Sequence, residues 1–309
     1  MRLLAALLFL VLGCHAAEPF LKPNDVIALV GGEDMVVANE MGYLEALLQS
    51  NLPEYHLKFR SLAWEGDTVF EQRRDLNYPT LEAQLEKMGA TVVIAQFGQM
   101  ESLAGTDHVG EFVAGYNKLL ARLCGDGKRK IALVEPHDFE PSLEAPQAHP
   151  GAPTALAPGY REGVSAMAKA HPGFLFLPIP SRSHFGLDIP CTRDGAHAGE
   201  NGQRDAARFM ASQLLGLPLP WKQANIAKEL KRPIEELQTG IVAKNRLWFQ
   251  YTRPQNWAFL AGDRTNQPSS RDHIDKNKRW FPEEMEKFVP LIEAKDQEIW
   301  ALAAKLNTK

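Results

Sequence analysis

Short apolar runs alternate with amphipathic stretches over the first two thirds of the chain. Five runs predict buried strands, at residues 25–30, 56–62, 91–95, 130–134 and 174–177. Their nearly continuous apolar character is typical of strands in a parallel sheet that is covered on both faces. The pattern therefore predicts a sheet between two layers of helices.

The stretches between these runs have helical periodicity. Apolar positions recur at intervals of three and four residues, and this spacing predicts helices at 39–52, 78–88, 109–123, 160–170 and 200–215. Strands that alternate with helices imply parallel pairing through right-handed crossovers. We therefore predict a three-layer α/β/α, flavodoxin-like fold with five parallel strands and a ligand crevice at their carboxyl ends.

The strand–helix alternation stops at Pro218-Leu219-Pro220. Beyond it we predict helices at 221–237 and 282–306, with an irregular, aromatic-rich stretch at 245–257. Two helices alone make a poor core. We therefore interpret 18–220 as the α/β domain and 221–309 as a mostly helical extension packed on it. Most of its large aromatic side chains are expected in the core, namely Trp248, Phe249, Tyr251 and Trp257.

The N-terminus has the three parts of a secretory signal. Arg2 is followed by an apolar run from Leu3 to Leu12 and then by small residues up to Ala17. We expect residues 1–17 to be removed and the protein to be exported to the periplasm or outside the cell. Cys14 leaves an alternative open, because a lipid attached to it would tether the protein. No other stretch predicts a transmembrane segment.

Composition and charge exclude some classes of partner and site. The formal net charge is −4, which gives no electrostatic case for nucleic acid. We expect no cofactor and no metal site, because no tight ligand spacing of the zinc type is present. Cys124 and Cys191 are expected at opposite ends of the sheet as separate thiols. Five isolated histidines are interpreted as surface or loop residues, although two of them, His137 and His184, fall at the crevice end: His108, His137, His171, His184 and His273.

Three short motifs follow predicted strands at the crevice end. Asp194 precedes His197 by three residues, and an aspartate so placed can orient an imidazole and stabilise its charged form. Gly66 follows the second strand and Gly98 the third. A glycine in such a turn can present its backbone N–H to a developing oxyanion, although a plain turn explains Gly66 equally well.

Together these motifs resemble the SGNH/GDSL hydrolase family over residues 25 to 216. The resemblance implies that Asp194 and His197 are the acid and base, and that Gly66 and Gly98 contribute oxyanion donors. It also implies a serine nucleophile after the first strand. The segment from Ile241 to Trp257 is similar to one that follows SGNH-like domains in some environmental bacteria.

The chain departs from this family at the reacting groups. Glu33 stands where the serine is expected, and a shift of one residue places Asp34 there instead. Met100 replaces the oxyanion asparagine, and Glu101 replaces the aspartate beside it. Methionine donates no hydrogen bond, and a missing oxyanion donor costs about 3 kcal/mol. Ordinary serine-esterase chemistry is therefore not expected.

Three functional interpretations remain open. The crevice could bind a small-molecule or carbohydrate ester without turnover. It could instead hydrolyse an ester of a carbohydrate or lipid by altered chemistry, with Glu33 or Asp34 as a carboxylate nucleophile, or with Glu33 and His197 in acid–base catalysis. Finally, the aromatic extension could dock a partner. The distance from these carboxylates to His197 is the decisive geometric quantity.

Overall fold

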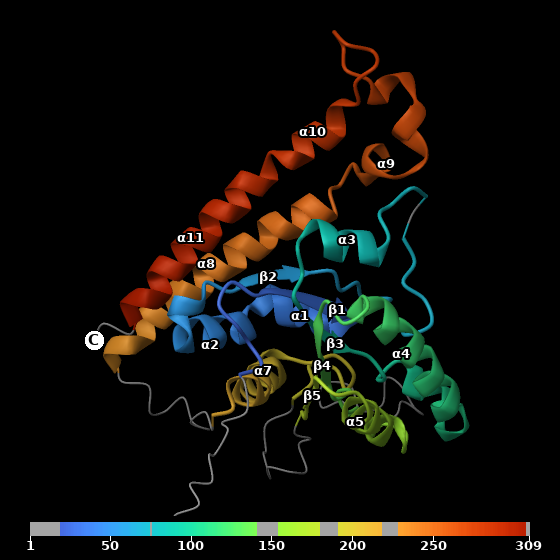
Figure 1. Cartoon of the computed structure of the whole chain (residues 1–309), viewed down its shortest axis with the longest axis vertical. Helices are drawn as coiled ribbons and strands as arrows, with labels where there is room; N and C mark the ends of the chain where they lie inside the picture. The colour runs from blue at the N-terminus through green and yellow to red at the C-terminus, as the bar shows by residue number, and fades with distance from the viewer. Residues whose placement is uncertain (1–18, 75, 141–153, 180–190, 218–227, 307–309) are drawn as a thin grey trace, which may run out of the picture.

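The computed structural model of the chain describes residues 19–74, 76–140, 154–179, 191–217 and 228–306. The predicted export signal, Cys14 and His184 lie outside these residues. Figure 1 shows an α/β body with a long helical hairpin along one side. None of the described helices is long and apolar enough to cross a membrane.

The body is built on the predicted five-stranded sheet. Neighbouring strands are all parallel, in the order β2-β1-β3-β4-β5, which is the flavodoxin-like arrangement. The fold class predicted from the sequence is confirmed. The strands are β1 (Val26–Gly31), β2 (Lys58–Ser61), β3 (Val92–Gln96), β4 (Lys130–Val134) and β5 (Phe174–Leu177).

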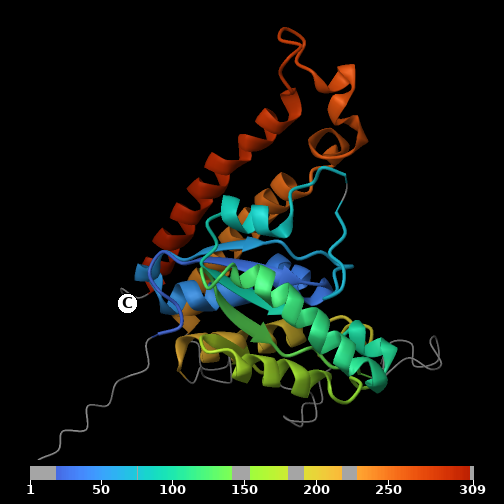
Figure 2. The ribbon, with the colours of Figure 1, turned by 45° about the vertical axis from the view of Figure 1, so that its right-hand side comes forward.

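Alternate residues of each strand point to opposite faces, and each face has its own core. Figure 2 shows helices on both faces of the sheet. Ile27 and Leu29 of β1 join the core on one face, and Ala28 and Val30 join the other. The first core is covered by α1 (Glu33–Met41), α2 (Tyr43–Asn51) and α7 (Glu200–Leu215). The second is covered by α3 (Leu81–Lys87), α4 (Val109–Cys124) and α5 (Tyr160–Ala170).

The first helical region differs from the prediction of one helix at 39–52. The helix α1 already begins at Glu33, and Gly42 separates it from α2. Gly42 has a left-handed backbone with φ of 68°, and a Cβ atom there would lie 2.7 Å from Ile241 Cγ2. Glycine is favoured because it tolerates both the conformation and the close approach. The early start of α1 places the two candidate carboxylates in its first turn.

The predicted irregular stretch at 245–257 is wrong for most of its length. One helix, α8 (Lys228–Thr252), continues through it. Its buried positions include Leu237, Ile241, Lys244 and Trp248, at helical spacings of four, three and four residues. The buried lysine interrupts the apolar pattern, and this obscures the helix in the sequence. The remaining elements are α9 (Trp257–Leu260), α10 (Trp280–Glu286) and α11 (Phe288–Leu306).

The hairpin of α8 and α11 covers the open edge of β2. Backbone carbonyls at alternate residues along this edge accept hydrogen bonds from its side chains. Trp300 Nε1 donates to Leu57 O at 3.0 Å, and Trp248 Nε1 donates to Ser61 O at 2.7 Å. Unpaired edge groups are a template for pairing with another chain. Here, side-chain donors from α8 and α11 pair with the carbonyls of this edge.

Two buried ion pairs fasten the hairpin to the body. Lys244 Nζ lies 2.6 Å from both carboxylate oxygens of Glu45, and both side chains are almost fully buried. Burial raises the pKa of Glu45, although Lys244 opposes the shift. Arg60 binds Asp296 through two bonds of 3.2 and 2.5 Å. Each buried charge therefore has a partner, which its burial requires.

The two cysteines of the α/β body are far from pairing. Cys124 ends α4, whereas Cys191 lies in the segment before α7. They are not joined by a disulfide, as predicted.

Candidate functional site

A cavity of about 180 Å³ lies at the carboxyl ends of the strands. It is lined by the segments that follow β1, β2, β3 and β4, together with His197. The crevice is therefore where the topology predicts it. Most of the candidate residues line it, namely Glu33, Asp34, Gly98, Met100, Glu101 and His197. Gly66 and Asp194 are not among the lining residues.

Asp194 orients His197 by direct contact. The Asp194 Oδ2 atom lies 2.7 Å from His197 Nδ1, and Oδ1 accepts the backbone N–H groups of Ala196 and His197 at 3.1 and 2.8 Å. Burial disfavours the charge of Asp194, but hydrogen bonds from His197 and Ala196 outweigh it and hold the pKa of this carboxyl well below its usual value. A carboxylate can only accept from Nδ1–H, so Nε2 is left to act as a base.

Buried contacts fix the segment that carries this pair. Glu140 Oε2 accepts the backbone N–H groups of Cys191 and Thr192 at 3.0 and 2.9 Å, and the Thr192 hydroxyl at 2.8 Å. Gly202 of α7 packs against the same segment, since a Cβ atom there would lie 2.1 Å from Cys191 O. No pattern in the sequence singles out Glu140, because its partners are backbone groups 51 and 52 residues away.

Glu33 and Asp34 occupy the first turn of α1, immediately after β1. Glu33 Oε1 pairs with Arg193 Nη2 at 3.1 Å, and Arg193 Nε also lies 3.5 Å from Asp194 Oδ2. Among the described residues, neither carboxylate makes a hydrogen bond to His197. Glu33 therefore does not form the predicted acid–base pair with His197 by direct contact in this structure.

Among the described residues, Asp34 is the one carboxyl of the crevice that has a buried oxygen without a hydrogen bond. Its Oδ1 atom is buried and has no hydrogen-bond partner there. Burial raises the pKa of Asp34, although His137, the Ala198 backbone and His197 oppose the shift. The carboxyl thus favours its protonated form more than an exposed aspartate does. Gln203 of α7 donates to the Asp34 carbonyl at 3.0 Å and fixes this end of α1.

The loop after β3 differs from the arrangement that the resemblance implies. Glu101 is buried, and its two oxygens accept the N–H groups of Gly98 and Val69 at 2.8 and 2.7 Å. Burial raises the pKa of Glu101, while these backbone groups oppose the shift. Met100 has an exposed fraction of 51%. The Gly98 N–H is therefore already occupied, and Met100 supplies no donor in place of asparagine.

Gly66 lies on an exposed turn, and nothing is within 4 Å of where its Cβ atom would be. Its neighbour Asp67 lines the crevice and is held by Arg74 through two bonds of 2.7 Å. The hairpin reaches this loop as well, because Arg253 pairs with Glu65 at 2.8 Å. The crevice acids after β2 are therefore neutralised by arginines.

His137 is a residue of the crevice that sequence reasoning placed among surface and loop histidines. It is buried and lines the cavity. Its Nδ1 atom lies 2.8 Å from Asp138 O, and since a carbonyl only accepts, Nδ1 is protonated. Its position directly after β4 was the available signal. No cluster of three potential ligands for a metal ion occurs within the described ranges.

Comparison with known proteins shows likeness in fold. No family model and no curated protein matches the chain by sequence. A gut microbial diltiazem-metabolising enzyme is 11% identical with a TM-score of 0.52, and the match covers 93% of this chain and 95% of that one. This coverage extends beyond the α/β body into the C-terminal helices.

Other solved structures match a smaller share of this chain. A protein described as a GDSL-like lipase from Parabacteroides merdae is 16% identical with a TM-score of 0.46, over 63% of this chain and 97% of that one. An aryl esterase of M. smegmatis is 16% identical with a TM-score of 0.40, over 62% and 99% of the two chains. At these identities the likeness concerns the fold only.

Proposed function

We propose that the protein is an exported hydrolase that cleaves an ester of a carbohydrate or lipid, with water in place of a serine nucleophile. The observation that carries the proposal is Asp34, a carboxyl with an unpartnered buried oxygen in the same cavity as the oriented His197. A group with a raised pKa can remain protonated and donate a hydrogen bond. We assign Asp34 the role of a proton-bearing donor and His197 the role of the base.

The reaction divides into addition and collapse. His197 Nε2 removes a proton from water as the water oxygen bonds to the ester carbonyl carbon, and the π electrons move to the carbonyl oxygen. That oxygen accepts a hydrogen bond from protonated Asp34. The bond to the alcohol oxygen then breaks, and His197 returns its proton to the leaving alcohol. Asp194 stabilises the imidazolium formed between the two steps.

The alternative roles for the carboxylates fit the geometry less well. A protonated carboxyl is a poor nucleophile, so the raised pKa of Asp34 argues against covalent attack by it. Glu33 is engaged by Arg193, which neutralises its charge beside the crevice. Water therefore remains as the attacking group.

The first experiment assays purified mature protein on 4-nitrophenyl acetate and on acetylated sugars. His197→Ala is expected to reduce turnover by about 10²–10⁴-fold, because it removes the base. His108→Ala is the matched control, since this histidine is exposed and lies outside the crevice. Equal rates for wild type and His197→Ala would contradict the proposal.

Variants of Asp34 separate a donor from a nucleophile. Asn keeps an N–H donor, so Asp34→Asn should retain more activity than Asp34→Ala. Equal loss in both would favour covalent attack. Wild-type turnover should fall as the pH rises through the raised pKa of Asp34, because the donor proton is lost. That decrease should be absent in Asp34→Asn.

A second candidate function is ligand binding without turnover. It is favoured by the loop after β3, where Glu101 occupies the Gly98 N–H and Met100 replaces a donor. It predicts that an ester or glycan raises the melting temperature while no product forms. Product release that depends on His197 would exclude it.

A further inference from the structure

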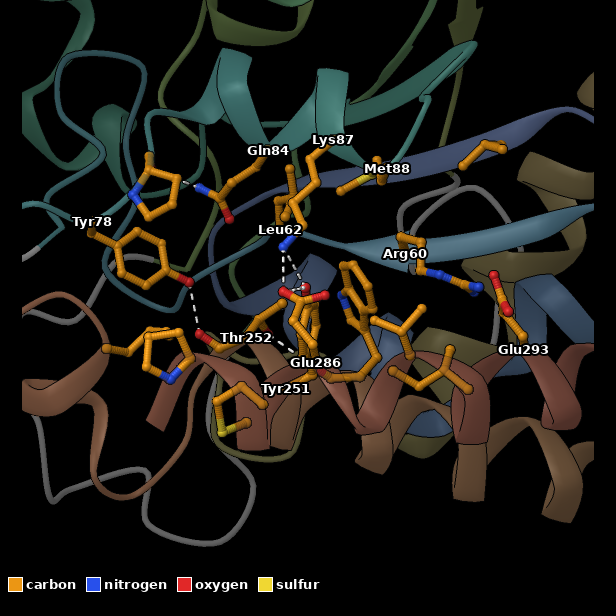
Figure 3. Close-up of a pocket in the computed structure, with 18 of the residues that line it drawn as sticks. Arg60, Leu62, Tyr78, Gln84, Lys87, Met88, Tyr251, Thr252, Glu286 and Glu293 are labelled. Carbon is orange, nitrogen blue, oxygen red and sulfur yellow. Dashed lines mark hydrogen bonds and ion pairs between the residues drawn. The ribbon is translucent and has the colours of Figure 1, made fainter. Parts of the chain in front are cut away.

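A second and larger cavity lies between β2, α3 and the helical hairpin (Figure 3). Its volume is about 370 Å³, against about 180 Å³ for the crevice, and the two share no lining residue. Small-molecule sites are typically about 300–1,000 Å³. This cavity therefore has the size of a binding site and is separate from the proposed active site.

Apolar side chains from several elements make up much of its wall. Leu62 follows β2, Met88 ends α3, and Trp248, Met285 and Ile292 come from the hairpin side. Four of these five are buried, and Met88 is partly buried. Methionine side chains adapt to irregular apolar ligands. The wall is suited to hydrocarbon.

Polar groups on the wall are largely satisfied by the protein. The Tyr78 hydroxyl donates to Thr252 O at 2.7 Å (Figure 3), and the Trp248 indole N–H donates to Ser61 O at 2.7 Å. Arg60 is occupied by Asp296. None of the buried side-chain atoms without a partner in the described ranges belongs to this cavity. A ligand there needs to supply no hydrogen bond to its walls.

The cavity follows the hairpin lengthwise. Its lining on α10 and α11 recurs at helical spacing from Pro282 to Glu293. Those residues span about 16 Å at 1.5 Å per residue. An elongated apolar space fits a hydrocarbon chain better than a compact ring system.

Partly exposed charged side chains also line the cavity. Lys87 of α3 bonds Glu286 and the Tyr251 hydroxyl at 2.7 Å each, so that it links α3 to the hairpin across the cavity (Figure 3). The Lys87–Glu286 pair is about half exposed. Lys58 and Glu293 also line the cavity, and the ammonium of Lys58 makes no hydrogen bond or ion pair with any described residue. A polar head group can therefore remain in water beside these charges while the chain is buried.

We propose that this cavity binds a single fatty acyl chain, from a free fatty acid or from a lipid. The chain lies along the hairpin, between Met88 and Met285, and its head group stays beside these charged side chains. The inference goes beyond the proposed ester hydrolysis and does not depend on it, since none of its residues lines the crevice.

Calorimetric titration with laurate and with lauroyl-lysophosphatidylcholine, each below its micelle concentration, tests the proposal on the mature protein. Saturable binding of at least one ligand is expected, with acetate giving none. Binding of laurate alone identifies the free acid as the source, and binding of the lysolipid identifies a lipid. Absence of binding by both would overturn the proposal.

Two variants of α11 locate the ligand. Val289→Trp fills the cavity and should weaken binding by about tenfold or more. Leu291→Trp places the same side chain on the same helix at an exposed position and should leave binding unchanged. His197→Ala should also bind normally. Loss of binding in His197→Ala, or full binding in a folded Val289→Trp protein, would contradict the proposed site.

Photo-crosslinking of the wild-type protein covers the case in which Val289→Trp does not fold. A laurate analogue with a terminal diazirine should label peptides from α3 and from residues 282–293. Labelling of the peptides that carry Asp34 or His197 instead would overturn the assignment.

Discussion

Two regions of this molecule bury charged groups. The regions differ in how fully these groups are paired by hydrogen bonds or ion pairs. In the interface between the hairpin and the body, which we call the seam, Lys244 forms an ion pair with Glu45 and Arg60 forms one with Asp296. In the crevice, Asp34 retains a buried oxygen without a partner among the described residues. Buried polar groups are normally hydrogen-bonded, so an exception requires a reason.

The difference distinguishes groups with a structural role from groups with a catalytic or binding role. A network in which every donor and acceptor is paired holds helices and strands in place but has no hydrogen-bonding group left for a substrate. An incomplete group costs stability and persists where function uses it. If the seam is structural and the crevice functional, substitutions in the seam should lower stability and substitutions in the crevice should lower activity.

Removal of one partner in the seam should be the most damaging change. Lys244→Met leaves Glu45 buried without its counter-ion, and this should lower the free energy of unfolding by about 3–5 kcal/mol. Denaturant unfolding measures the loss. The double variant Lys244→Met/Glu45→Leu should recover much of it, because no unpaired charge remains. A single variant as stable as wild type would show that the pair does not fasten the hairpin.

Glu140 should have the next largest effect, because its buried hydrogen bonds hold the segment that carries Asp194 and His197. Glu140→Ala leaves two buried N–H groups and a hydroxyl without their acceptor, at a cost of about 2–3 kcal/mol. If Glu140 positions His197, kcat should fall more than KM changes, and Glu140→Gln should restore part of it. Unchanged kcat in a stable variant would limit Glu140 to a structural role.

Substitution of Asp34 by Asn should increase the stability of the folded protein, whereas the two substitutions above should decrease it. Its raised folded-state pKa means that its contribution is full below its ordinary pKa and is lost as the pH rises through the raised value. Asp34→Asn removes this loss and should therefore raise the stability of the protein at pH values above the raised pKa. Melting temperatures of both proteins across this pH range measure it. A variant that is less stable at every pH would contradict the pKa shift.

The exposed bridge between α3 and the hairpin should matter least. Glu286→Gln removes the ion pair with Lys87, which is about half exposed, and should cost no more than about 0.5 kcal/mol. The cost should vanish at high salt because exposed pairs are screened. A larger, salt-independent loss would show that this contact belongs with the buried seam.

The α/β body was predictable because each strand and helix has its own apolar pattern. The hairpin was less so. Lys244 and Asn245 are buried in α8, and their partners, Glu45 and the Asn39 carbonyl, lie about 200 residues away. Local periodicity carries no trace of such partners, so the part of α8 from residue 245 onward was predicted to be irregular. The start of α1 was missed for a related reason, since two acids at Glu33 and Asp34 do not look like a buried helix end.

The site was predictable as a location. The resemblance and the strand ends indicated where Glu33, Asp34, Gly98 and His197 would gather, and all four line one cavity. The sequence could not decide which carboxylate is free, because that depends on Arg193 reaching Glu33 from 160 residues away. Nor could it predict that Glu101 occupies the Gly98 N–H.

The row of carbonyls on the outer edge of β2 has a consequence for the newly synthesised chain while it folds. Until the hairpin is in place, the edge at Leu57, Phe59 and Ser61 lacks its cover. The residues of α8 and α11 are synthesised after those of the α/β body, so the newly made body has an exposed edge strand until they fold onto it. Truncation after α7 would make that condition permanent, and we expect such a fragment to associate with its own copies rather than remain a smaller working protein.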